Sequence, residues 1–221
     1  VEEVDGGAEF FAVDPETQKR SPLFSNQQVR MLTGALEEKY GVELDALPFL
    51  SFDYVMQNQA IFFVYNEQDH LFHLEDATLR VLYKPEVERA PYTDELMRRM
   101  ETSQLWNGTY SHDYRWFAYV KGYDIYLVNT ETKQQKRLTY GSEEQMNGRP
   151  SWVYPEEFGQ RDAYWFSPDN KKIAYLQYQE TDVYQYPIIH ELEFETGLEL
   201  ERYPKAGEAN PTVNLFIVDI E

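Results

Sequence analysis

The chain has 221 residues, 16% of them aromatic, and its 20 basic and 39 acidic residues give a net charge of −19. This length suits one large domain or two small ones, and the negative charge argues against nucleic acid and anionic membranes as partners, because both are polyanions. Cysteine is absent, which excludes disulfides and thiolate chemistry, and no apolar run approaches the roughly 20 residues of a membrane helix. Since no signal peptide is visible and residue 1 is Val, we expect a mature or cut segment.

Two short helices are predicted in the first half of the chain. Residues Thr33–Tyr40 are good helix formers, and Gly41 suits a C-cap. Residues Thr93–Met100 begin with a capping threonine followed by acids in the first turn. Both helices are short enough to be insertions between strands.

The His70-Leu71-Phe72-His73 segment has the spacing of a helical metal site. Its residues are more typical of a strand, in which side chains three positions apart face opposite ways. No metal site is therefore predicted there.

One sequence pattern occurs twice in the second half of the chain. Ser111–Val120 and Ser167–Leu176 share the pattern Ser-x-Asp-x-basic-x-apolar-Ala-Tyr-apolar, and their starts are 56 residues apart. Asp and Asn side chains bind their own backbone in turns, so each copy predicts a turn followed by a short strand. A looser third copy is predicted at Ser51-Phe52-Asp53, leading into a strand at Ile61–Val64.

A second pattern, in which a strand leads into a polar turn, relates Phe10–Thr17 to Tyr126–Thr132, with weaker copies at Leu74–Thr78 and Leu215–Glu221. Further strands are predicted at residues 123–128, 135–139 and 164–166, and a loop at Pro204–Pro211 precedes the last strand. Strands and turns that repeat at a period of about 50 residues are typical of β-propeller blades. We predict an all-β fold of about three to four propeller blades with short helical insertions; the alternative is a meander within a β-sandwich.

Two adjacent carboxylates, Glu156 and Glu157, lie in the aromatic, loop-like stretch Trp152–Phe158. Like charges side by side repel, and burying either one is costly unless a cation offsets it. In a concave site such a pair would bind a protonated amine, which carries three donors and one positive charge. The alternative is a solvated acidic turn in an acidic protein.

Motifs that carry catalytic chemistry are absent. The sequence has no G-x-S-x-G elbow, no P-loop and no G-x-G-x-x-G. Ser111, His112 and Asp113 are consecutive in a predicted turn, so they cannot form a triad among themselves. No catalytic residue and no cofactor is therefore predicted in this chain.

Two stretches match a known family in order. Residues Ser151–Gln185, with Trp152–Glu157 and Tyr164–Asp169, and then Tyr203–Val213, resemble the β-propeller of dipeptidyl peptidase IV and its relatives in the prolyl oligopeptidase family of serine peptidases. The resemblance is strong from about residue 106 to 221 and only blade-like before that.

The resemblance implies a role for the acidic pair. Glu156 and Glu157 occupy the positions at which this family binds the α-amine of its substrate. Binding there places the peptide bond after the second residue at the site of cleavage. Pro155 stands where some relatives carry a third acid. The family also uses a propeller arginine on substrate carbonyls; Arg80 and Arg115 lie on predicted blades but in no matching motif.

The resemblance further implies that residues 1–221 are the N-terminal propeller portion of a longer enzyme that releases N-terminal dipeptides, X-Pro or X-Ala, from peptides with a free N-terminus. The α/β-hydrolase domain that carries the Ser-Asp-His triad is absent from this chain, so this segment alone should be inactive. The chain ends at Ile220-Glu221, where a strand gives way to its turn, so we expect a blade left unfinished and a segment cut from something longer.

Family members often form homodimers, and the resemblance suggests a periplasmic, cell-surface or secreted location. The alternatives are a non-catalytic propeller that serves as a binding scaffold, and a relative that has lost its serine.

Overall fold

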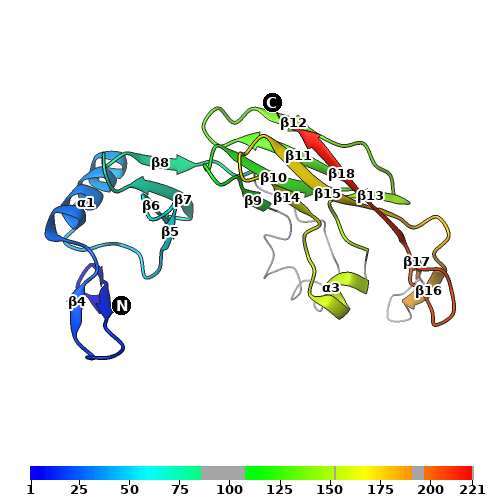
Figure 1. Cartoon of the computed structure of the whole chain (residues 1–221), viewed down its shortest axis with the longest axis horizontal. Helices are drawn as coiled ribbons and strands as arrows, with labels where there is room; N and C mark the ends of the chain where they lie inside the picture. The colour runs from blue at the N-terminus through cyan, green and yellow to red at the C-terminus, as the bar shows by residue number, and fades with distance from the viewer. Residues whose placement is uncertain (86–107, 152, 191–196, 221) are drawn as a thin grey trace. The chain divides into compact units, whose positions relative to one another are not determined.

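The computed structural model describes residues 1–85, 108–151, 153–190 and 197–220 (Figure 1). Strands predominate in these residues, which confirms the all-β prediction, and the chain divides into two compact units, Val1–Tyr83 and Lys84–Glu221. The helix predicted at Thr93–Met100 lies outside the described residues. Within the described ranges, no helix has the length and apolar character needed to cross a membrane.

The first unit contains helix α1, Asn26–Tyr40. Its predicted end is confirmed, because Gly41 adopts the left-handed conformation (φ 66°) that a C-cap glycine favours. The helix begins earlier than the predicted Thr33, because Ser25 and Gln28 form a capping box. The Ser25 hydroxyl accepts from the Gln28 N–H (3.2 Å), and the Gln28 side chain accepts from the Ser25 N–H (2.9 Å).

The strands of the first unit form two hairpins and one larger sheet. The hairpins join β1 (Glu2–Val4) to β2 (Gly7–Glu9) and β3 (Phe11–Val13) to β4 (Arg20–Pro22). The antiparallel sheet has the order β5-β6-β7-β8, with bounds Asp53–Val55, Ala60–Tyr65, Gln68–His73 and Leu79–Leu82. Helix α1 contributes Leu32 and Leu36 to a core that also contains Ile61, Phe63 and Phe72 from this sheet. The predicted strand at Ile61–Val64 is therefore confirmed.

The prediction of a third turn copy at Ser51-Phe52-Asp53 is wrong. Asp53 begins strand β5, whereas the turn between the first two strands of this sheet is built at Met56–Asn58. These three residues all have positive φ (52°, 56° and 66°). This turn is formed by residues in the left-handed region and contains no Ser–Asp pattern that could mark it in the sequence.

The second unit begins with an antiparallel sheet of four strands that are neighbours in sequence and in space. Its strands are β9 (Gly108–Tyr110), β10 (Trp116–Lys121), β11 (Asp124–Asn129) and β12 (Gln135–Arg137). The predicted strands in this region are confirmed. A four-stranded meander is the form of a propeller blade.

The other sheet of the second unit has an interrupted first strand. Strands β13 (Gln145–Asn147) and β14 (Tyr164–Phe166) pair along one edge of β15 (Lys172–Gln179), β14 with residues 173–175 and β13 with residues 177–179. Strand β18 (Thr212–Asp219) pairs with the other edge. Residues 148–163 therefore form an insertion within one strand position, and this insertion contains α3 (Val153–Phe158).

A hairpin of β16 (Gln185–His190) and β17 (Gly197–Arg202) is inserted between β15 and β18. After it, residues 203–211 form the predicted loop before the last strand.

The two larger sheets of the second unit share a core. Ala118, Ile125 and Leu127 from the first sheet lie in one buried cluster with Tyr164 and Ile173 from the other. The Tyr164 hydroxyl donates a hydrogen bond to the Ala118 carbonyl (3.1 Å), which ties β14 to β10.

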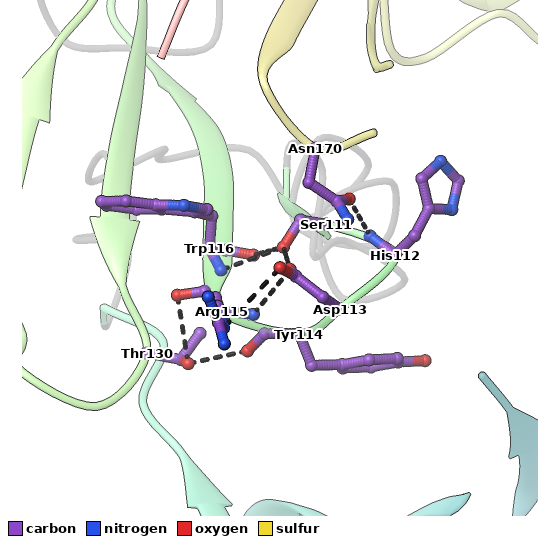
Figure 2. A network of polar contacts seen from close by, with 8 residues as sticks. All are labelled: Ser111, His112, Asp113, Tyr114, Arg115, Trp116, Thr130 and Asn170. Carbon is purple, nitrogen blue, oxygen red and sulfur yellow. Dashed lines mark hydrogen bonds and ion pairs between the residues drawn. The ribbon is translucent and has the colours of Figure 1, made fainter. Parts of the chain in front are cut away.

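The repeated Ser-x-Asp pattern forms the same turn twice. The Ser111 hydroxyl donates to Asp113 (2.7 Å) and accepts from the Trp116 N–H (3.0 Å), as Figure 2 shows. The Ser167 hydroxyl donates to Asp169 (2.6 Å) and accepts from the Lys172 N–H (2.9 Å). The fourth residue of each turn has positive φ, 58° at Tyr114 and 59° at Asn170. The predicted turn–strand repeat is confirmed at this atomic level.

Candidate functional site

The two predicted site residues, Glu156 and Glu157, lie on α3 within the insertion that interrupts the β13–β14 strand position. The stretch predicted as loop-like is a short helix, and Pro155 is tolerated because it lies in the first turn, where no N–H partner is lost. Both carboxylates are on exposed residues. Neither forms a hydrogen bond or ion pair with any residue that the structure describes.

Aromatic packing holds this helix on its sheet. The Tyr154 ring meets the fully buried ring of Tyr178 edge-on, with centroids 5.0 Å apart, and lies 5.7 Å from the Phe158 ring. Burial raises the pKa of Tyr178 to about 12, so its hydroxyl is neutral at physiological pH. Ring packing through Tyr154 therefore attaches the helix to strand β15.

A separate acid, Glu180, follows strand β15 and is only 5% exposed. Burial raises the pKa of the Glu180 carboxyl, and the positive charges of Arg202 and Arg149 partly offset that effect. The Arg202 guanidinium also donates to the Glu180 carbonyl (2.7 Å) and to the Glu144 carboxylate (2.9 Å), so it is engaged in holding the hairpin end.

The other residues singled out in the sequence have structural roles. Ser111 and Asp113 belong to the turn of Figure 2 rather than to a triad, and Arg115 lies 3.8 Å from the Asp113 carboxylate. In the first unit, His70 is buried on β7, with its ring nitrogens 2.7 Å from the Tyr40 hydroxyl and 2.9 Å from the Gln68 carbonyl. No cluster of three or more potential metal ligands occurs in the described part of the chain.

The structure adds one feature that the sequence did not indicate. A hollow of about 250 Å³ lies between strands β9 and β14 and is lined by Thr109, Tyr110, His112, Asp162, Tyr164, Trp165 and Phe166. Its two walls are about 50 residues apart in the chain, and no local motif links them. Neither Glu156 nor Glu157 lines it.

These observations define an all-β protein with propeller-type blades and an exposed acidic pair on a helical insertion. A family model, described as the dipeptidyl peptidase IV (DPP IV) N-terminal region, matches residues 57–221. The chain belongs to this family.

Curated relatives match about half of the chain. Dipeptidyl peptidase 4 of Trichophyton tonsurans is 44% identical over 111 residues, which is 47% of this chain and 14% of that protein. Dipeptidyl peptidase 4 of Felis catus is 37% identical over 117 residues, which is 50% of this chain and 15% of that protein. The matched stretch is thus about one-seventh of the length of these relatives.

Solved structures share the fold. A putative dipeptidyl aminopeptidase IV from Bacteroides ovatus superposes with a TM-score of 0.61 at 19% sequence identity. The match covers 95% of this chain and 26% of that chain. Porphyromonas gingivalis dipeptidyl peptidase 4 gives a TM-score of 0.52 at 20% sequence identity. The match covers 98% of this chain and 30% of that chain.

Proposed function

We propose that residues 1–221 are the substrate-recognition propeller portion of a serine exopeptidase that releases N-terminal dipeptides, X-Pro or X-Ala. In this proposal Glu156 and Glu157 bind the protonated α-amine of the peptide. The observation that carries it is the position of the pair, which is exposed on an insertion within a blade of a chain that belongs to the DPP IV N-terminal family.

The geometry supports this role in two ways. The insertion interrupts the first strand position of its sheet, and the blades of a propeller surround a central channel, so an insertion from a first strand is well placed to reach it. The two carboxylates lack a cationic partner among the described residues, so an ammonium group with three donors would supply the missing charge. A peptide bond in mid-chain has no such charge, so the pair would select for a free N-terminus.

The chemistry of bond cleavage belongs to the rest of the parent protein. The serine hydroxyl of an α/β-hydrolase domain would attack the carbonyl carbon of the second substrate residue, and the peptide bond would break so that the rest of the peptide leaves as an amine. Water would then hydrolyse the dipeptidyl ester and release the dipeptide. We also propose that the parent is exported to the periplasm, the cell surface or the outside, and that it forms a homodimer.

The test uses the intact parent protein and a chromogenic dipeptide substrate with a free amine. We expect Glu157→Gln to lower kcat/KM by about 100-fold or more, because one member of the charge pair to the ligand is lost. Glu143→Gln, an exposed acid in the same unit, is the matched control and should leave kcat/KM unchanged. A loss below about tenfold for Glu157→Gln would show that the amine is bound elsewhere.

A serine-directed fluorophosphonate separates the enzyme from a scaffold. Labelling of the parent supports the peptidase. An unlabelled parent points to a non-catalytic binding propeller or to a relative without the serine.

A further inference from the structure

The hollow between β9 and β14 is separate from the acidic pair. Thr109, Tyr110 and His112 form one wall, and Asp162, Tyr164, Trp165 and Phe166 form the other. At about 250 Å³ it is smaller than the roughly 300–1,000 Å³ of sites for drug-sized ligands. Its size suits a single long side chain.

Aromatic rings and one acid give the hollow its chemistry. Four of its seven lining residues are aromatic, and the Trp165 side chain is 48% exposed. Its acid is Asp162, and the lining includes neither lysine nor arginine. A ring face attracts cations, and Trp does so best among the aromatic residues.

The walls are held in place by contacts that connect the two sheets. Tyr164 donates its hydroxyl hydrogen to the Ala118 carbonyl (3.1 Å). The His112 N–H donates to the Asn170 side-chain oxygen (2.8 Å), and Figure 2 shows the His112 ring directed away from the hydrogen bonds of its turn. These bonds join the turn after β9 to the turn after β14. The hollow is therefore a fixed feature of the second unit.

The negative charge of Asp162 is only partly balanced by positive charge nearby. Asp162 is an exposed residue, yet enough protein surrounds its carboxyl to raise its pKa above the usual range. The neighbouring Arg161 opposes that shift without removing it. A cation placed beside the carboxyl would stabilise its charged form.

We propose that the hollow binds a guanidinium or ammonium group on an aliphatic stem, as in an arginine or lysine side chain of a peptide. The stem lies against the exposed Trp165 ring, and the cationic head meets the Asp162 carboxylate. The chain's net charge of −19 favours approach of such a ligand. This site takes a side chain rather than an α-amine, so it does not depend on the proposed function of Glu156 and Glu157.

The probe is Nα-acetyl-arginine amide, whose blocked amine cannot occupy the acidic pair. Its binding to the intact parent is measured by isothermal titration calorimetry at pH 8, where imidazole side chains are ordinarily neutral. We expect saturable binding, and at least about tenfold weaker binding of Nα-acetyl-citrulline amide, a neutral analogue of the same shape. Equal affinity for the two probes, or no saturable binding of the arginine probe, would overturn the proposal.

Two variants locate the site. Asp162→Asn should weaken arginine binding by at least about tenfold, because the carboxylate partner is lost. Trp165→Leu should also weaken arginine binding, because the aromatic face that attracts the cation is lost. Glu157→Gln should leave it unchanged, which distinguishes this site from the proposed amine site. Unaltered binding by both Asp162→Asn and Trp165→Leu proteins with native circular dichroism spectra would place the ligand elsewhere.

Discussion

The buried carboxylate of Asp124 is the centre of a hydrogen-bond network in the second unit. Its side chain is 6% exposed and accepts four hydrogen bonds, from the Arg137 guanidinium (2.6 Å), the Thr139 hydroxyl (2.9 Å), the Gly141 N–H (2.6 Å) and the Asn147 amide (3.3 Å). These donors come from β12, β13 and the segment between them. Asp124 therefore connects the two larger sheets of this unit.

The cost of altering Asp124 follows from these contacts. In Asp124→Asn, one oxygen still serves the three donors at Oδ1, but an NH₂ group faces the Arg137 guanidinium. A hydrogen bond to a charged group contributes about 1.5–3 kcal/mol. Because the Arg137 side chain is 39% exposed, water replaces part of that bond, and we expect a loss of about 1–2 kcal/mol. Asp124→Ala also leaves buried donors without an acceptor, so we expect a loss of about 3–5 kcal/mol.

Thermal unfolding followed by circular dichroism measures these losses. At about 2–4 °C per kcal/mol for a chain of this size, we expect Tm to fall by about 2–8 °C for Asp124→Asn and about 6–20 °C for Asp124→Ala. Hydrogen exchange at the Gly141 N–H should accelerate in Asp124→Ala, which removes its acceptor, and much less in Asp124→Asn, which keeps it. The control is Asp219→Asn, which alters an exposed ion pair with Lys172 and should leave Tm unchanged. If Asp124→Ala melts like the control, the four contacts contribute nothing to stability and the reasoning fails.

Three further predictions concern other parts of the chain. Gly148 has φ 71°, and an added Cβ would lie 2.6 Å from Ile125 Cγ1, so Gly148→Ala should destabilise by about 1–3 kcal/mol more than Gly122→Ala, whose φ of 63° adds strain without a clash; equal Tm values would refute this. Burial lowers the pKa of His70, so its neutral form stabilises the fold, and stability should fall as pH drops below about 6.5, the unfolded-state value. Urea unfolding at pH 7.5 and 5.5 tests this, and His70→Phe should reduce the pH dependence; an unchanged dependence would contradict it. Ser167→Ala removes an acceptor for the Lys172 N–H (2.9 Å) and should raise hydrogen exchange at that amide, whereas continued protection would contradict the role assigned to the turn.

Local chemistry explains what the sequence could predict. The turns at Ser111 and Ser167 are specified by side chains that bind their own backbone, so the pattern and the structure coincide. The same is true of the end of α1, where Gly41 supplies the left-handed cap. The earlier start of α1 was also readable, because Ser25 and Gln28 have the spacing of a capping box.

The sequence could not predict features that depend on pairing between segments far apart in the chain. Strand β13 is only three residues long, and its place is set by antiparallel pairing with residues 177–179 of β15, with the Gln177 amide donating to Asn147 (2.8 Å). The hollow joins Tyr110 and His112 to Asp162 and Trp165, and only the packing of two sheets brings them together. Glu156 and Glu157 stood out in the sequence as adjacent carboxylates and the family resemblance implied their role, whereas their helical insertion into a strand position required the structure.

Discrimination between free and blocked substrate amines tests the central claim most directly. We propose measuring kcat/KM of the intact parent for a free-amine dipeptidyl substrate and for its N-acetylated form, in the natural protein and in the Glu156→Gln, Glu157→Gln double variant. The account predicts strong preference for the free amine in the natural protein and its loss, by about 100-fold or more, in the double variant. A preference that survives both substitutions would contradict the assignment of these two carboxylates to the substrate amine.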